Sequence, residues 1–144
     1  MKKTDEPIII EQTFNVSRQE LWSAITELNH MTKWFFENIK SFEPKVGFET
    51  NFIVKNENRI FAHLWRITEV KPGESITFNW RYEGYEGDSF VSFYLSEYEG
   101  ASKLMLTHNV TDTFSQNIQE FKRENCIEGW NWFIKKRLKK YLEK

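Results

Sequence analysis

The sequence has little cysteine, proline and glycine, and it has no long apolar run. It holds one Cys, 3 Pro and 6 Gly among 144 residues. A single cysteine, Cys126, excludes an internal disulfide and a zinc site built from cysteines. The scarcity of Pro and Gly leaves no linker of the kind that separates domains. We therefore predict a single domain over residues 1–144.

Three classes of protein are disfavoured by what the chain lacks. No stretch approaches the ~20 apolar residues of a membrane span. The first ten residues hold no apolar run long enough for a signal peptide. Lys+Arg total 20 against 21 Asp+Glu, a net charge of -1, without the basic bias of nucleic-acid binders. We expect a cytoplasmic protein with no nucleic-acid partner.

Aromatic side chains are abundant. The chain has 13 Phe, 6 Trp and 5 Tyr, which together make up 17% of its residues. This composition excludes intrinsic disorder, because such side chains supply ample apolar area for a core. A chain of this length buries ~68–70% of its unfolded surface. It therefore needs neither a metal nor a disulfide to fold, and we expect no cofactor.

The first third of the chain predicts one strand and two short helices. The β-branched run at Ile8–Asn15 is typical of a strand. Ser17 and Glu20 form a capping box, in which each side chain accepts from the other residue's N–H group. Apolar residues at helical spacing then predict a helix over Arg18–Leu28. A second short helix is expected around Met31–Phe36.

Five strands with short turns are predicted next. The second is long and lacks one clean alternation, which indicates a bulge. Short turns between sequential strands imply antiparallel pairing. The five expected strands are Phe48–Val54, Arg59–Val70, Ser75–Tyr82, Ser89–Ser96 and Ser102–Val110.

The chain closes with one long amphipathic helix, expected over Gln119–Leu142. Its apolar residues recur at intervals of three and four and form one stripe. That stripe must be buried against another element, and the concave side of a curved six-stranded sheet is the apolar face that remains. We therefore predict an α+β fold in which the sheet wraps around this helix. The stripe consists of Ile127, Trp130, Ile134, Leu138 and Tyr141.

Several of these segments resemble one known family. The order of elements is similar to the START-like, or SRPBCC, superfamily, whose helix-grip fold is that of the birch-pollen allergen. Within it the chain resembles the branch named after the activator of heat-shock-protein-90 ATPase. This superfold hosts lipid carriers, hormone receptors, cyclases, dehydratases and chaperone regulators, so the resemblance predicts the fold better than the function. The matching stretches are Phe14–Thr26, Met31–Phe35, Ile67–Trp80, Leu104–His108 and Gly129-Trp130.

The chain departs from the family pattern at two positions. It has Gly47-Phe48 where the family often has two glycines. It has Trp65 where the family often has a small residue. Both changes add bulk, so an inward orientation would make the cavity smaller than is usual in the family.

The resemblance implies an apolar cavity between the sheet and the long helix, suited to a hydrophobic or aromatic small molecule. The alternative is that the same side chains fill the core completely. We place Trp34 and Phe35 at the entrance of such a cavity. The other expected lining residues are Phe48, Phe52, Phe78, Trp80, Phe93, Leu95, Leu104, Leu106, His108, Trp130 and Ile134.

Few polar residues suggest chemistry. His108 shares a strand face with Leu residues and either orients a polar ligand or acts as a base, or else has only a structural role. His63 and His30 are far from it in sequence, so we expect no metal site. Glu69 either reaches the cavity or forms an ion pair with an arginine on the sheet surface. Cys126 is expected to be a small packed residue, not a nucleophile.

Trp132 falls opposite the apolar stripe of the long helix. An exposed tryptophan there would mark a contact surface for another protein or a second subunit. The alternative is that it packs under the loop around Asp112–Asn117. The lysines of Lys135–Lys140 either favour an acidic partner or form a solvated helix face.

The sequence is compatible with three functions. The first is non-enzymatic binding of a hydrophobic or aromatic small molecule, which we prefer. The second is regulation of a chaperone through protein contacts, as the family name implies. The third is a cyclase- or dehydratase-like enzyme, ranked last because the sequence offers no close pair of titratable groups. An unpaired edge strand allows either a monomer or a homodimer.

Overall fold

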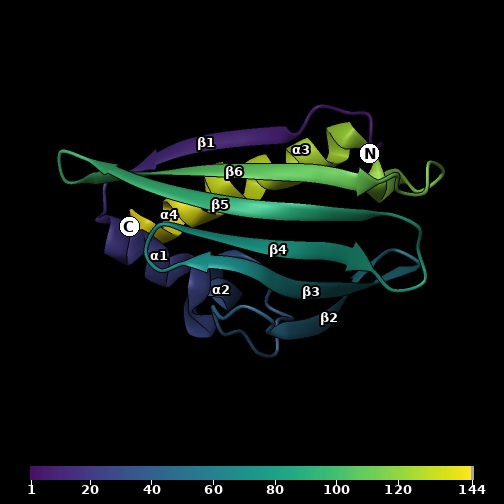
Figure 1. Cartoon of the computed structure of the whole chain (residues 1–144), viewed down its shortest axis with the longest axis horizontal. Coiled ribbons are helices and arrows are strands. Elements are labelled where there is room, and N and C mark those ends of the chain that lie inside the picture. Colours follow the sequence, from purple (N-terminus) through teal and green to yellow (C-terminus); the bar gives the residue numbers. More distant parts are fainter. Residues whose placement is uncertain (144) are drawn as a thin grey trace.

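The computed structural model describes residues 1–143 and shows one sheet with helices on one side (Figure 1). Within these residues no helix is long and apolar enough to cross a membrane. The elements in order are β1 (Ile8–Phe14), α1 (Arg18–Thr26), α2 (Leu28–Trp34), β2 (Glu49–Asn56), β3 (Arg59–Lys71), β4 (Ser75–Tyr82), β5 (Asp88–Tyr98), β6 (Ala101–Asp112), the 3₁₀ turn η1 (Gln119–Phe121), α3 (Arg123–Asn131), the π-helical segment η2 (Trp132–Leu138) and α4 (Lys139–Leu142).

The sheet has six strands in the order β1-β6-β5-β4-β3-β2, and every neighbouring pair is antiparallel. Figure 1 shows this order, with the C-terminal helix crossing behind the strands. The predicted α+β class and the helix-grip architecture are confirmed. The expected bulge in β3 is present, because the register with β4 shifts between Ile67 and Glu69.

The predicted capping box begins α1. The Ser17 hydroxyl accepts from the Glu20 N–H at 3.1 Å. The helix ends at Thr26, two residues earlier than expected, because Glu27 is in an extended conformation. The chain turns helical again at once, so α2 starts at Leu28 and ends at Trp34.

The C-terminal helix runs continuously from Arg123 to Leu142 through α3, η2 and α4. It starts four residues later than predicted, because Lys122 is extended and separates η1 from α3. Trp130, Ile134 and Leu138 are buried, as the stripe predicted. The π-helical turns of η2 were not predicted, since a widened turn leaves no signal in the apolar spacing.

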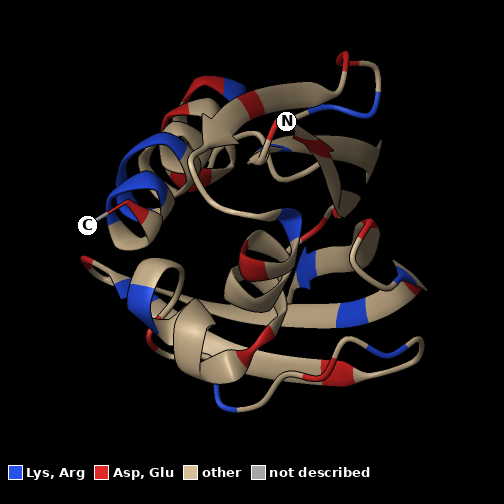
Figure 2. Ribbon diagram, turned by 90° about the vertical axis from the view of Figure 1, so that its left-hand side faces the viewer, with Lys and Arg blue, Asp and Glu red and all other residues tan. Residues whose placement is uncertain are grey.

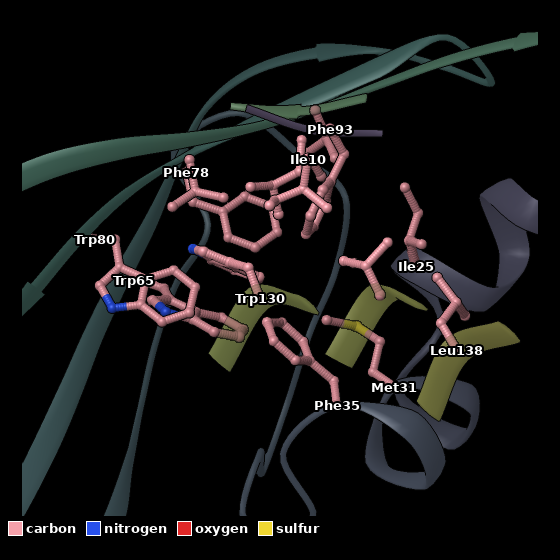
Figure 3. Packing of buried hydrophobic residues seen from close by; sticks show 14 of the residues in the cluster. Ile10, Ile25, Met31, Phe35, Trp65, Phe78, Trp80, Phe93, Trp130 and Leu138 are labelled. Carbon is pink, nitrogen blue, oxygen red and sulfur yellow. The ribbon is translucent and has the colours of Figure 1, made fainter. Parts of the chain in front are cut away.

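Aromatic rings fill the middle of the core (Figure 3). Trp34 and Phe35 stack at 4.7 Å between ring centroids, and Trp65 lies 5.6 Å from Phe35 and 5.0 Å from Trp80. Trp65 therefore points inward and occupies space that a small residue would leave open. Phe48 is half-buried just before β2, where its ring meets that of Phe42.

Candidate functional site

A cavity of about 350 Å³ lies between the sheet and α3. Its sheet wall comes from β2, β3, β4 and β6, and its opposite wall from η1, α3 and η2. Polar side chains near the tips of β2 and η1 form its rim, and they are partly exposed to solvent. The aromatic lining consists of Phe36, Phe61, Trp80, Tyr82, Phe121, Trp130 and Phe133.

Three of the residues expected from the sequence line this cavity: Trp80, His108 and Trp130. Trp34 and Phe35, expected at an entrance, are instead almost completely buried in the core. The other expected residues also lie outside the lining, buried in the core except for half-buried Phe48. They are Phe48, Phe52, Phe78, Phe93, Leu95, Leu104, Leu106 and Ile134.

Most of the lining residues were not among those expected from the sequence. Phe61 and His63 alternate with Trp65 along β3 and face inward together. That alternation was obscured by the bulge farther along the strand. Phe36 follows the end of α2 and Phe121 ends the short 3₁₀ turn η1, and neither place has a periodicity that reports which way a side chain points.

Gly129 lines the cavity from the last turn of α3, where the helix continues into η2. A β-carbon added there would have no atom within 4 Å except its own helix and chain neighbours. Glycine inside a helix destabilises the protein by roughly 0.5–1 kcal/mol relative to alanine. The missing side chain leaves open a volume that a larger residue would occupy.

His108 is held by hydrogen bonds on both ring nitrogens. The Ser89 hydroxyl donates its hydrogen to the Trp80 carbonyl at 2.8 Å, so His108 Nε2–H must donate to Ser89 Oγ at 2.9 Å. His108 Nδ1 then accepts from Trp130 Nε1–H at 3.1 Å. Burial lowers the pKa of His108 to about 3, so the ring is neutral. Neither nitrogen has a free lone pair for proton abstraction.

His63 and Tyr82 face each other across β3 and β4, with ring centroids 4.8 Å apart. His63 Nδ1–H donates to the Phe61 carbonyl at 3.2 Å, and burial lowers its pKa to about 4. The Tyr82 hydroxyl accepts from Trp80 Nε1–H at 2.9 Å, and burial raises its pKa well above the ordinary range. Both side chains line the cavity and are neutral at pH 7.

An ion pair crosses the rim of the cavity. Arg59 Nε–H donates to both carboxylate oxygens of Glu120, at 2.9 and 3.0 Å, and Asn56 Nδ2 donates to the same group. Burial acts to raise the pKa of Glu120, but the hydrogen bonds from Arg59 and Asn56 hold it below its usual value. These contacts tie the β2–β3 hairpin to η1.

Comparison with known proteins identifies the family. The sequence model of the family described as "Activator of Hsp90 ATPase homolog 1-like protein" matches residues 15–143. The chain belongs to this family. No curated protein matches the sequence.

Solved structures show the same fold. CV1439 from Chromobacterium violaceum superposes with a TM-score of 0.78 at 20% identity, over 96% of this chain and 97% of that one. CalU16 from Micromonospora echinospora has a TM-score of 0.68 at 28% identity, over 95% of this chain and 74% of that one. The Aha1 dimer from Colwellia psychrerythraea has a TM-score of 0.71 at 19% identity, over 96% and 97%.

The remaining polar candidates of this Hsp90-activator-like chain lie at or outside the rim. Cys126 Sγ donates to the Glu120 carbonyl at 3.5 Å, and burial raises the pKa of the thiol to about 11. Glu69 is exposed and forms an ion pair with Lys71 at 3.9 Å; within residues 1–143 it forms none with an arginine. His30 is in α2 and bonds to Tyr141. Among residues 1–143, no three His, Cys, Asp or Glu side chains come together as a metal site.

Trp132 lies on the outer side of the C-terminal helix and is 52% exposed. It is not packed under the loop after β6. Lys135, Lys136 and Lys140 are exposed on the same helix. Figure 2 shows basic residues gathered on its last turns.

Proposed function

We propose that this protein binds an uncharged hydrophobic molecule with an aromatic ring in the cavity between sheet and α3, without chemical conversion. The observation that carries the proposal is the cavity itself, about 350 Å³ in volume and lined by seven aromatic side chains. Ligand sites are typically ~300–1,000 Å³ and mostly apolar. The volume equals about a dozen water-sized groups, which suits one or two fused rings.

The electrostatics of the wall favour a neutral ligand. His63 and His108 are both uncharged at pH 7, because burial lowers the pKa of each ring. At the rim Arg59 forms an ion pair with Glu120, and the exposed side chain of Lys55 lines the opening. A charged ligand would lose its hydration on entering the aromatic interior, because the charged residues of the lining, Lys55 and Glu120, lie at the rim.

The occupied nitrogens of His108 argue against its use as a general base. A general base needs a free lone pair within reach of the substrate. His108 Nδ1 already accepts from Trp130, and Nε2 carries a hydrogen that is donated to Ser89. The residue that looked most like a catalytic group therefore holds the wall together.

Filling the cavity tests the proposal. Gly129→Phe places a ring in the open space beside α3, and Gly129→Ala is the matched control that leaves most of it free. Calorimetric titration with 2-naphthol should show saturable binding to the wild type and to Gly129→Ala, and at least tenfold weaker binding to Gly129→Phe. Equal affinity for all three proteins would refute a site in this cavity.

The second candidate function is contact with an Hsp90-type chaperone through the outer side of the C-terminal helix. The family description supports it, as does Trp132, whose large apolar side chain is half exposed beside Lys135 and Lys136. Exposed aromatics with basic neighbours are typical of surfaces that bind acidic partners.

A pull-down with purified Hsp90 tests this second candidate. Trp132→Ala should abolish capture, and Lys135→Glu should weaken it in a salt-dependent manner. Tyr98→Ala is a control, because Tyr98 is also an exposed aromatic residue but lies at the end of β5. Equal capture of wild type and Trp132→Ala would remove this candidate.

A further inference from the structure

The inner wall of the cavity offers two polar groups that the protein itself leaves unused. The indole N–H groups of Trp80 and Trp130 are both bonded, to Tyr82 and His108. Both nitrogens of His108 are bonded as well. Of the polar atoms on this aromatic wall, one nitrogen of His63 and one hydrogen of Tyr82 remain.

The free nitrogen of His63 is an acceptor. A backbone carbonyl can only accept, so the contact between Nδ1 and the Phe61 oxygen fixes the hydrogen on Nδ1. Nε2 of the neutral ring then carries a lone pair, and within residues 1–143 it has no hydrogen-bond partner. The ring is held in place by stacking on Phe52, 4.7 Å away with an interplanar angle of 18°.

The free hydrogen of Tyr82 is a donor. The phenolic oxygen accepts from Trp80 Nε1–H, so its own O–H remains available, and no acceptor for it exists in the described part of the chain. Stacking on Phe121, with centroids 4.8 Å apart, fixes the ring. The two side chains are register partners on adjacent strands, their ring centroids lie 4.8 Å apart, and both line the cavity.

We propose that His63 and Tyr82 form a recognition site for a hydroxyl group carried directly on the ligand's aromatic ring, so that the ligand class is a phenol. A phenolic hydroxyl donates one hydrogen bond and accepts another, which matches the lone pair of His63 and the O–H of Tyr82. The surrounding rings of Phe36, Trp80 and Phe133 would contact the apolar remainder. This inference rests on the proposed function and adds the ligand class to it.

Three probes separate the two hydrogen bonds. 2-Naphthol both donates and accepts, 2-methoxynaphthalene only accepts, and naphthalene does neither. In calorimetric titrations we expect the affinity to fall in that order, by about three- to tenfold for each lost hydrogen bond. A site with unpaired polar groups discriminates against a ligand that lacks the matching group.

Each variant should abolish one of the two differences in affinity between the probes. His63→Phe removes the acceptor and should make 2-naphthol and 2-methoxynaphthalene equal in affinity. Tyr82→Phe removes the donor and should make 2-methoxynaphthalene and naphthalene equal. Tyr85→Phe is the matched control, because Tyr85 packs on Phe61 and Phe121 but does not line the cavity. It should keep all three affinities.

The outcomes distinguish the phenol site from the apolar cavity on which it rests. If all three probes bind the wild type equally, or if Tyr82→Phe behaves as Tyr85→Phe does, the phenol site is overturned and the apolar cavity stands. If none of the probes binds the wild type, both proposals fail. Tyr82→Phe keeps the buried aromatic ring, so it should fold. Its comparison with Tyr85→Phe therefore tests the phenol site even if His63→Phe does not fold.

Discussion

The indole N–H of Trp130 donates to Nδ1 of His108 across 3.1 Å and joins α3 to β6. The other side of the imidazole is bonded to Ser89 on β5, so one buried ring connects the helix with two strands. A buried polar group that is fully satisfied fixes the position of its neighbours, whereas a partly satisfied one destabilises the fold. This contact sets how the helix lies along one wall of the cavity.

Removing the donor should therefore destabilise the protein. Trp130→Phe leaves His108 Nδ1 buried without a partner, which costs about 1–3 kcal/mol in addition to the lost packing. Urea unfolding followed by far-ultraviolet circular dichroism measures the change. Trp132→Phe, on the exposed side of the helix, should alter stability by less than about 0.5 kcal/mol. Similar losses for the two variants would contradict the structural role of the contact.

The two buried histidines predict a loss of stability in mild acid. Burial lowers the pKa of His63 to about 4 and of His108 to about 3, from an ordinary value of 6.5. Between pH 6.5 and 4 the unfolded chain therefore binds more protons than the folded one. The free energy of unfolding is therefore fully retained above pH 6.5. Below that pH it falls by about 1.4 kcal/mol per pH unit for each histidine.

Unfolding free energies measured at pH 7.5 and pH 5 test this expectation. The wild type should lose about 3–4 kcal/mol over this interval, which lies above the range where ordinary carboxyl groups titrate. His63→Phe should lose about half as much. A stability that does not change between these pH values would show that neither histidine is held neutral.

Gly129→Ala should stabilise the protein by about 0.5–1 kcal/mol, because alanine restricts the unfolded chain and favours the helix. The added methyl group meets no atom within 4 Å outside its own helix and chain neighbours, so no strain opposes the gain. Thermal unfolding gives the measurement. A lower midpoint than the wild type would mean that the space beside α3 is already filled.

The core outside the cavity should not tolerate added volume. Phe78→Trp, Leu106→Trp and Ile134→Trp each enlarge a completely buried side chain. Each should cost about 1–3 kcal/mol and leave the affinity for 2-naphthol within about threefold. A variant that keeps full stability but loses the ligand would show that the site extends into this part of the core.

Local sequence signals predicted much of the fold. The capping residues Ser17 and Glu20 fixed the start of α1, and the spacing of Trp130, Ile134 and Leu138 identified the buried face of the C-terminal helix. Such signals arise within a few residues of one another. The widened turns of η2 and the break at Lys122 do not alter which residues are apolar, so the sequence could not reveal them.

The site was harder to predict than the fold. Periodicity shows that Phe78 and Trp80 share an inward face, but only Trp80 reaches the cavity, because depth along a curved sheet is set by tertiary packing. Trp65 packs against both Phe78 and Trp80 and fills the core outside the cavity. The sequence showed Gly129 as part of the family-like Gly129-Trp130 pair. Only the structure shows that its missing side chain leaves space open beside α3.

The location of a bound aromatic ring tests the central claim most directly. Nuclear Overhauser effects between 2-naphthol and the indole protons of the protein report which of the six tryptophans it touches. We expect contacts with Trp80 and Trp130 in the wild type and their loss in Gly129→Phe. Contacts with the exposed Trp132 instead, or contacts that persist unchanged in Gly129→Phe, would contradict a ligand site between the sheet and α3.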